Sequence, residues 1–281
     1  MKKGLALEGG AMRGMFTCGV IDVFMENGVE FDGISGISAG AIFGCNYKSK
    51  QIGRGVRYNK KWGRDPRYFG FRSLIITGDL YGRDFCYHRI IDELDPIDKE
   101  AYKNNPIDFF VGATDVEEAV IRYHNCKIVD TETIEWMRAS ASMPLVSNIV
   151  EVSGYKLLDG GVINPIPYKI LEENGYDKIV VILTQPRGFV KKKTSIIPIM
   201  RIAMHKYRKF VDAMARRHIV YNEETKELKE KEKIGEVFII SPETSLGIKR
   251  TENNPNELER VYQIGRNEAK KNLERVKNFL S

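Results

Sequence analysis

Gly36-Ile37-Ser38-Ala39-Gly40 follows directly on the strand-like stretch Phe31-Asp32-Gly33-Ile34-Ser35. After the turn, Ala39, Ile42 and Phe43 have the spacing of a helix that buries one face. A G-x-S-x-G pattern between a strand and a helix is typical of a nucleophile elbow, which holds a serine hydroxyl exposed at the top of a sheet. Ser38 is therefore a candidate nucleophile, and Gly36 and Gly40 are the glycines of its turn.

A second glycine-rich turn, Glu8-Gly9-Gly10-Ala11-Met12-Arg13-Gly14, precedes the first by one strand–helix unit. It follows the apolar stretch Gly4-Leu5-Ala6-Leu7 and leads into a second helical pattern. A serine that attacks a carbonyl carbon needs backbone N–H groups aimed at the oxyanion that forms, and such a turn can supply them. Two successive strand–turn–helix units predict that the turns lie side by side on a parallel sheet.

The composition is that of an ordinary folded protein. The chain has 281 residues, of which 42% are hydrophobic, enough for one large α/β domain or a domain with a smaller appendage. The four cysteines lack metal-ligand spacing, so we expect reduced thiols in a cytoplasmic protein. The apolar stretch after Met1-Lys2-Lys3 is too short for a signal peptide, and no later stretch has membrane-spanning length.

The formal charge of +6 is concentrated in two segments. Residues 48–72 carry nine Lys or Arg against the single acid Asp65, and residues 187–217 carry ten against Asp212. The first segment also contains aromatic residues. Such clusters suit an anionic surface, either phospholipid headgroups or nucleic acid. No nucleic-acid-binding module is recognisable, so we expect peripheral contact with an anionic membrane rather than nucleic acid.

Hydrophobic periodicity divides the rest of the chain into strands and helices. Strands are expected at 108–114, 119–123, 156–158, 178–183 and 236–240. Helices are expected at 131–140 with Thr131 as N-cap, at 167–174, at 196–220 and from Pro255 to about Leu280. We expect residues 1–185 to form the catalytic domain, with 48–106 as an irregular lid or insert. Residues 186–281 would form a mainly helical region with one strand, packed on that domain.

A serine nucleophile needs a base, and two types of candidate exist. His205 and His218 come late enough in the chain for a Ser-Asp-His triad, but both fall in the basic helical segment. Asp159-Gly160-Gly161 places a carboxylate on a tight turn just after a strand. Asp-Gly is also a common turn dipeptide, so the motif counts only together with the other two.

Taken together, the motifs resemble those of the patatin-like phospholipase family over roughly residues 4–185. The resemblance rests on four motifs in the family's order: Gly9–Gly14, Gly36–Gly40, Arg138-Ala139-Ser140-Ala141-Ser142-Met143-Pro144, and Leu157–Gly161 with Asn164-Pro165-Ile166-Pro167 behind it. It implies a three-layer α/β/α fold with a mostly parallel sheet, here with a helical C-terminal extension. It also implies a serine lipid acyl hydrolase of the phospholipase A or lysophospholipase type.

The resemblance further implies the residues of a catalytic site. Ser38 would be the nucleophile, and Asp159, with Gly160 and Gly161 beside it, would be the base of a Ser-Asp dyad without histidine. The oxyanion hole would lie in the turn of Gly9, Gly10, Ala11, Arg13 and Gly14. Ala11 departs from the family, which commonly has a third glycine there, and a positive φ would strain an alanine. Arg13 would assist the oxyanion, bind an anionic headgroup or pair with an acid.

Three other interpretations of the sequence remain. A nucleotide-binding protein would use the Gly9–Gly14 turn for phosphate, but the ribose-binding acid and the G-K-[ST] motif are missing. A nucleic-acid binder would use the basic segments, and a silent scaffold would retain the motifs without activity. We expect no cofactor, and no metal because nothing resembles a calcium-binding loop; the expected partner is a lipid ester at a membrane surface.

Overall fold

The computed structural model describes residues 1–281 without a gap, and a single eight-stranded sheet forms its centre. The strands are β1 (Lys3–Leu7), β2 (Gly33–Ile37), β3 (Asp108–Asp115), β4 (Val120–Asn125), β5 (Val150–Val152), β6 (Tyr155–Asp159), β7 (Lys178–Ile182) and β8 (Val237–Ile240). Their order is β5-β6-β3-β2-β1-β7-β8, and β4 pairs with β3. Strands β3, β2, β1, β7 and β8 run parallel to one another. Strands β4 and β6 pair antiparallel with β3, and β5 pairs antiparallel with β6.

Helices connect the strands. The α-helices are α1 (Met15–Glu26), α2 (Ala39–Lys48), α3 (Arg54–Trp62), α4 (Phe71–Thr77), α5 (Lys99–Asn104), α6 (Thr131–Ala141), α7 (Lys169–Glu173), α8 (Ile197–Ala203), α9 (Arg208–Lys233) and α10 (Pro255–Leu280). Two short 3-10 helices, η1 (Ala11–Gly14) and η3 (Gly160–Val162), and a π-helix, η2 (Phe85–Leu94), complete the set.

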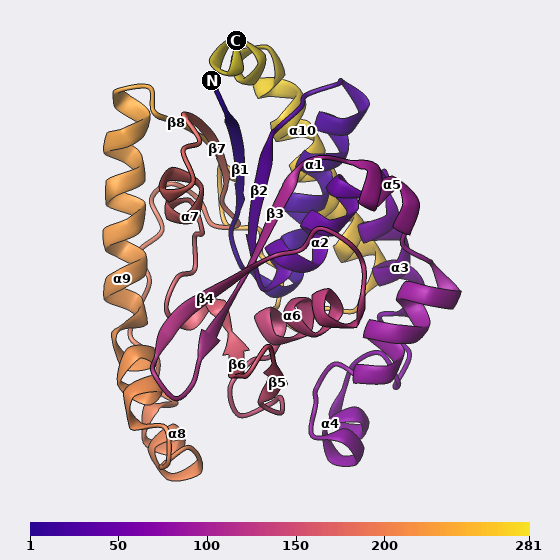
Figure 1. Cartoon of the computed structure of the whole chain (residues 1–281), viewed down its shortest axis with the longest axis vertical. Coiled ribbons are helices and arrows are strands. Elements are labelled where there is room, and N and C mark those ends of the chain that lie inside the picture. The colour runs from indigo at the N-terminus through magenta and orange to yellow at the C-terminus, as the bar shows by residue number, and fades with distance from the viewer.

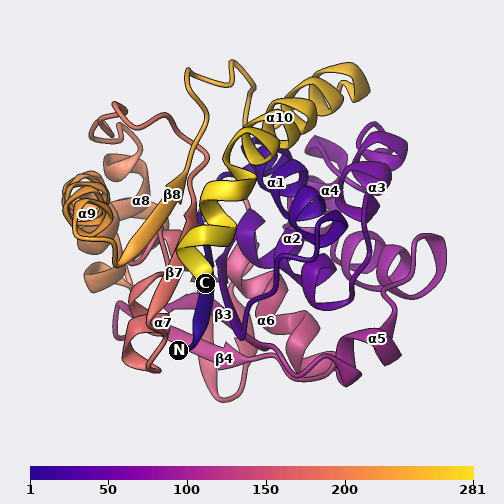
Figure 2. The same cartoon turned by 90° about the horizontal axis from the view of Figure 1, so that it is seen from above.

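Both faces of the sheet are covered, which gives the three α/β/α layers that the sequence predicts. Along β7, Val180 and Ile182 belong to the large core shared with α1, α2 and α10, whereas Ile179 and Val181 belong to the core under α7 and α9. This alternation follows from the two-residue period of a strand. Viewed from above, α9 lies on one side of the strands and α1, α2 and α10 on the other (Figure 2).

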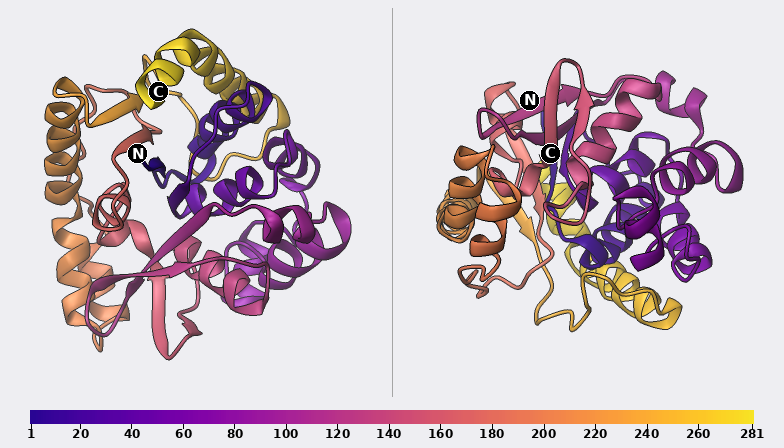
Figure 3. Two further views of the ribbon diagram at one scale, coloured as in Figure 1. Left: turned by 45° about the horizontal axis from the view of Figure 1, so that its top comes forward. Right: turned by 90° about the horizontal axis from the view of Figure 1, so that it is seen from below.

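The C-terminal region is joined to the rest at two places. Strand β8 adds to the sheet beside β7, and α10 packs lengthwise against α1 (Figure 3). A Cβ on Gly19 would lie 2.1 Å from the Tyr262 carbonyl oxygen, and one on Gly265 equally close to that of Phe16. Glycine at both positions therefore lets the two helix backbones touch. The Tyr262 hydroxyl also donates to Asp22 at 2.8 Å.

Three local expectations differ from the structure. Residues 48–106 are largely helical rather than irregular, because apolar side chains such as Tyr58, Phe85 and Ile90 pack into the main core. The segment 196–220 is not one helix. Helix α8 ends at Ala203, and α9 begins at Arg208 and continues to Lys233. The N-cap of α6 is Asp130 rather than Thr131, because its carboxylate accepts from the Thr133 N–H.

Candidate active site

Ser38 lies at the junction of β2 and α2, where the chain reverses sharply. Its backbone has φ 54° and ψ −120°, a conformation that non-glycine residues rarely adopt. The neighbouring glycines make the close approach possible: a Cβ on Gly40 would lie 2.3 Å from the Leu7 carbonyl oxygen, and one on Gly36 would lie 2.7 Å from the Ala41 nitrogen. The G-x-S-x-G segment thus has the strained strand-to-helix geometry that its sequence predicts.

A buried serine on α6 holds this elbow in place. The Ser140 hydroxyl accepts from the Ser38 N–H at 2.8 Å and donates to the Gly112 carbonyl at 2.6 Å. It therefore ties the elbow to β3, and an alanine there would leave a buried N–H without a partner. The sequence includes Ser140 in the 138–144 motif without assigning it a role, and only the contact with Ser38 reveals one.

Asp159 ends β6 and is also held through its main chain. Its N–H donates to the Ser142 carbonyl at 2.8 Å, and its carbonyl accepts from the Thr114 hydroxyl at 2.9 Å. Its side-chain carboxylate accepts from the Gly161 N–H at 2.7 Å, and it lines the same pocket as Ser38. The structure therefore brings together two motifs that are far apart in the sequence.

The environment of Asp159 favours a stronger base than an ordinary aspartate. The residue is only 9% exposed, and burial raises the pKa of its carboxyl. The positive charge of Arg217, the nearby Ser38 hydroxyl and the Gly161 N–H each lower this pKa again. Burial is the larger effect, so the carboxyl binds a proton more readily than it would in water.

The Gly9–Gly14 turn lies against the elbow and keeps several N–H groups free. The Gly9 N–H donates to the Pro165 carbonyl at 3.3 Å, and the Arg13 N–H to the Gly10 carbonyl at 3.2 Å. The N–H groups of Gly10 and Ala11 have no acceptor within the protein. Ala11 has a φ of 48°, so the residue that departs from the family's glycine does adopt a left-handed conformation.

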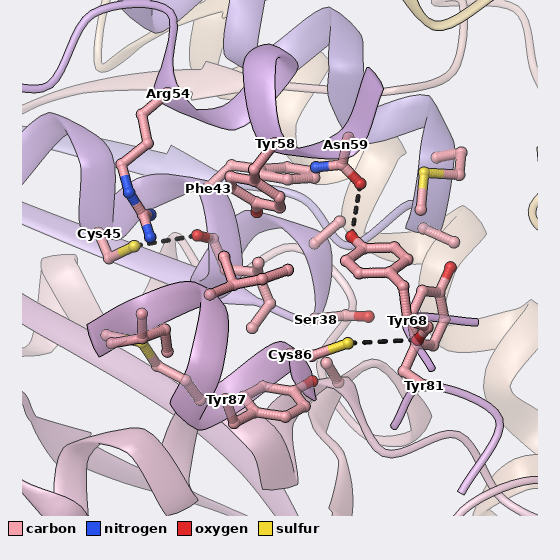
Figure 4. A pocket seen from close by; sticks show the side chains of 18 of the residues that line it. Ser38, Phe43, Cys45, Arg54, Tyr58, Asn59, Tyr68, Tyr81, Cys86 and Tyr87 are labelled. Atoms are coloured by element: carbon pink, nitrogen blue, oxygen red, sulfur yellow. Dashed lines mark hydrogen bonds between the residues drawn. The ribbon is translucent and has the colours of Figure 1, made fainter. Parts of the chain in front are cut away.

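One side of Ser38 opens into an apolar pocket of about 830 Å³ (Figure 4). Of its 20 lining residues, 17 are hydrophobic, and most of the 20 come from α2, α3, η2 and the segments between them, with others from η1 and α6. At one wall Arg54 is fully engaged, because its guanidinium donates to the Asp95 carbonyl and to the Asn46 side chain. The pocket therefore suits an apolar chain.

The other side of Ser38 opens into a pocket that is rich in cations. It contains Ser38, Asp159 and Gly161 together with three arginines, Arg13, Arg217 and Arg250. Gly9, Gly10 and Ala11 line it as well. Of the remaining predicted site residues, Gly14, Gly36, Gly40 and Gly160 lie behind these walls, where a side chain would collide with neighbouring atoms. Sequence analysis did not single out Arg217 or Arg250 as site residues, although Arg217 lies in the second basic segment.

None of the four histidines lines either pocket. The His124 ring stacks on Trp136, and His205 contacts the Ile202 carbonyl of α8. His218 is on α9, where its Nδ1 is buried without a partner. No three His, Cys, Asp or Glu side chains gather in a geometry that could hold a metal ion. No helix combines the length and the apolar composition needed to cross a bilayer.

Comparisons with known proteins agree with the architecture. Residues 207–281 match a domain of unknown function, DUF6363. The chain is 29% identical to the uncharacterized protein YjjU of Escherichia coli over 65% of this chain and 52% of YjjU. It is 26% identical to the neuropathy target esterase sws of Drosophila melanogaster over 64% of this chain and 12% of that protein. Lysophospholipase NTE1 of Cryptococcus neoformans is likewise 26% identical, over 64% of this chain and 11% of NTE1.

The chain thus spans about half or less of the length of these relatives. Among solved structures, VipD from Legionella pneumophila aligns with 97% of this chain and 67% of its own, at 12% identity and a TM-score of 0.46. The family described as patatin-like phospholipase matches residues 5–172, which contain Ser38, Asp159 and both glycine-rich turns. By this match over more than half of its length, the chain belongs to the patatin-like phospholipase family.

Proposed function

We propose that the protein hydrolyses acyl esters of lipids, with Ser38 as nucleophile and Asp159 as base. The observation that carries this proposal is that Ser38 and Asp159 line the same pocket, with Ser38 on a strained elbow between that polar pocket and an apolar one. Membership of the family supports it, as do relatives named as an esterase and a lysophospholipase. A nucleophile and a base within hydrogen-bond reach are the signature of covalent acyl transfer.

In the first half-reaction Ser38 Oγ bonds to the ester carbonyl carbon while its proton passes to Asp159. The carbonyl oxygen becomes an oxyanion, which the free N–H groups of Gly10 and Ala11 stabilise. Each such donor contributes about 2.7–4 kcal/mol in comparable sites. The carbon–alkoxyl bond then breaks, Asp159 returns the proton to the leaving alkoxide, and the alcohol departs from the acyl-enzyme.

In the second half-reaction water attacks the acyl carbon and gives its proton to Asp159. The tetrahedral species collapses, the Ser38–acyl bond breaks, and the proton returns to Ser38 Oγ. One ester and one water thus yield one alcohol and one carboxylic acid. The raised pKa of Asp159 matters here, because an ordinary aspartate is a weak base toward a hydroxyl.

The apolar pocket beside Ser38 is the natural place for the acyl chain. Since burying one methylene group is worth about 0.8 kcal/mol, a chain laid along this pocket binds tightly. We propose that residues 1–185 supply the catalytic groups and this pocket, with the helical part of 48–106 as its cover. Residues 186–281 would pack on that unit and complete the opposite side of the site.

We further propose that the protein meets its substrate at a membrane surface through α4 and α8. These helices lie at the end of the molecule toward which β1 and β2 run, which is also the Ser38 end (Figure 1). Ile75 on α4 is 83% exposed and Ile202 on α8 is 80% exposed, and each helix also carries an arginine. Exposed apolar side chains beside cations suit the interfacial zone of an anionic bilayer.

Vesicle flotation tests this contact. Ile75→Asp and Ile202→Asp are expected to weaken binding to vesicles that contain anionic lipid. The control is Ile234→Asp, which alters an equally apolar and 71% exposed residue just beyond the opposite end of α9. Equal flotation of all three variants would count against the proposed surface.

Active-site labelling tests the chemistry. A fluorophosphonate probe should label the wild-type protein at Ser38 and leave Ser38→Ala unlabelled, because the probe reacts only with an activated serine. A variant with all four histidines replaced by Asn or Gln should still be labelled and should still hydrolyse a short-chain ester. If His218→Asn alone removed the activity of a folded protein, a triad would replace the dyad.

A further inference from the structure

The pocket on the polar side of Ser38 holds more positive charge than ester hydrolysis requires. Arg13, Arg217 and Arg250 all line it, and no carboxylate lies within 4.0 Å of any of their guanidinium groups. By contrast, other cations on the same helix as Arg217 form ion pairs: Lys209 and Lys231 on α9 each pair with a glutamate. Arg13 and Arg217 are partly buried, and an unpaired buried cation is unfavourable unless a ligand supplies negative charge; Arg250 adds a third cation that is exposed.

Two of these arginines are held in position by neutral groups. The Arg13 Nε donates to the Thr184 hydroxyl at 3.4 Å, and the Arg217 Nε donates to the Gly161 carbonyl. Their terminal NH2 groups make no hydrogen bond with the protein, and the Arg250 side chain makes none at all. The side chains are therefore oriented and still have free donors, as a preformed anion site requires.

The electrostatic environment supports the same conclusion. Burial lowers the pKa of Arg13 and of Arg217, and the neighbouring arginines lower both further. Lys191, next to the cluster and 4.5 Å above the Tyr221 ring, has its pKa lowered to about 7 by burial and by the same arginines. The acids that face this group are Glu8 and Asp159. A bound anion would relieve this repulsion among cations.

We infer that the preferred substrate is an acyl ester whose alcohol part carries a phosphate monoester. This inference rests on the proposed hydrolysis at Ser38. The acyl chain lies in the apolar pocket, the ester lies at Ser38, and the phosphate binds Arg13, Arg217 and Arg250. A guanidinium group can donate two parallel hydrogen bonds to two phosphate oxygens. A phosphate dianion also compensates three positive charges more completely than a zwitterionic or neutral headgroup does.

The inference gives the C-terminal region a part in substrate choice. Arg217 is on α9 and Arg250 follows β8, so both lie within residues 207–281, the match to the domain of unknown function. Arg13 alone comes from the patatin-like part. Chemistry and acyl binding would thus belong to one part of the chain, and headgroup selection largely to the other.

The test compares three soluble octanoyl esters below their micelle concentration, so that membrane binding plays no part. Their alcohols are glycerol 3-phosphate, glycerophosphocholine and glycerol. The wild-type kcat/KM is expected to be highest for the phosphate monoester, by about tenfold over the glycerol ester, since only the phosphate accepts charge-assisted hydrogen bonds from the arginines. In Arg217→Gln and in Arg250→Gln this ratio should fall about tenfold, mainly through KM.

Matched controls come from the neighbouring residues. Arg216 and Lys249 are exposed and line neither pocket, so Arg216→Gln and Lys249→Gln remove the same charge without touching the site. The ratio should stay at its wild-type value in both. Because Arg250 is exposed, its variant should fold even if Arg217→Gln does not, and circular dichroism melting checks each protein.

A binding experiment separates the sources of phosphate. Glycerol 3-phosphate should inhibit hydrolysis of the glycerol ester competitively in the wild type and much less in Arg250→Gln. If inorganic phosphate bound as well as glycerol 3-phosphate but did not inhibit hydrolysis of the glycerol ester, the arginines would form a free-anion site, and the inference would be wrong. Equal kcat/KM for the three esters, or arginine variants that change vesicle binding only, would overturn it too. Absence of Ser38-dependent hydrolysis of any ester would instead refute the proposed function.

Discussion

The two pockets that meet at Ser38 are built from different parts of the chain. Every residue of the apolar pocket lies between Ala11 and Met143, within the patatin-like match. The cationic pocket combines residues of that match with Ile196, Met214, Arg217 and Arg250 from the last third of the sequence. The elbow and the apolar pocket thus belong to one part of the chain, and the C-terminal region adds a second, charged wall.

The two pockets also differ in how they discriminate among ligands. Burial of an apolar chain is non-directional and grows with each methylene group, so the apolar pocket tolerates related chains. Guanidinium groups require an acceptor in a defined direction, so the cationic pocket selects more sharply. The following predictions test this division, starting with the groups that both pockets share.

The largest effect should come from the proposed dyad between the pockets. Ser38→Ala and Asp159→Asn should each lower kcat by at least about ten-thousandfold, since loss of the nucleophile or its base has comparable effects in serine hydrolases. The readout is hydrolysis of a short-chain ester by protein whose melting temperature matches the wild type. Substantial turnover by Asp159→Asn would mean that another group accepts the proton.

The next largest effect concerns the apolar pocket alone. From butanoyl to octanoyl esters of one alcohol, kcat/KM should rise by about a hundredfold, because each added methylene group is buried. Ile91→Trp should flatten this rise, because the indole occupies space in the pocket that Ile91 lines. Ile91→Val, which leaves the space open, serves as the control. A chain-length profile that Ile91→Trp leaves unchanged would place the acyl group elsewhere.

A smaller effect links the cationic pocket to the base. Asp159 must be ionised to accept a proton, and its pKa is raised by burial, so kcat/KM should fall on acidification at a pH above that of an ordinary aspartate. Arg217, and to a lesser extent Arg250, lowers this pKa. In Arg217→Gln the acidic limb should therefore move to higher pH, and in Arg250→Gln it should move less.

The pH profile is measured with an uncharged ester, so that no substrate group titrates. Arg217→Lys keeps the positive charge and should keep the limb near its wild-type position. If Arg217→Gln shifted the limb toward lower pH, the electrostatic connection between the two residues would be wrong.

The smallest effect should appear at Ala11, which lines both pockets. Ala11→Gly should stabilise the protein by up to about 1 kcal/mol, because glycine adopts its φ of 48° without strain. Denaturant unfolding measures this, with Ala41→Gly inside helix α2 as the control, which should destabilise by a similar amount. Destabilisation by Ala11→Gly would show that the methyl group contributes packing that outweighs its strain.

Much of the fold follows from local sequence patterns. Apolar runs such as 178–183 and the glycine turns at 9–14 and 36–40 predict the strands and their parallel arrangement. Helix ends were harder to predict: both Asp130 and Thr131 are good N-caps, and only the bond to the Thr133 N–H distinguishes them. Within 48–106 the sequence indicates helix only near 84–94, where η2 lies; elsewhere the basic residues obscure a periodicity that becomes clear only where side chains such as Tyr58 enter the core.

In the candidate site, too, some residues can be predicted from local sequence and others only from the tertiary structure. Ser38, Asp159 and the Gly9–Gly14 turn stand out in the sequence because glycines mark the turns on which they lie. Ser140 could be noticed only as part of a motif, since its contacts with Ser38 and Gly112 join three separate segments. Which N–H groups of the first turn stay free also depends on tertiary structure, because the Gly9 N–H is occupied by Pro165, a residue beyond Asp159.

The sequence by itself determined the strand–turn–helix units and pointed to Ser38 and Asp159 as the candidate reactive side chains, because the glycine turns on which they lie depend on backbone sterics within a few residues. Only the tertiary structure decided which cations face the site. Arg216 and Arg217 are adjacent and chemically identical, yet one is exposed to solvent and the other reaches Gly161 beside the Asp159 carboxylate. That difference arises from how α9 packs against β8 and η3, and it cannot be predicted from the run of basic residues alone.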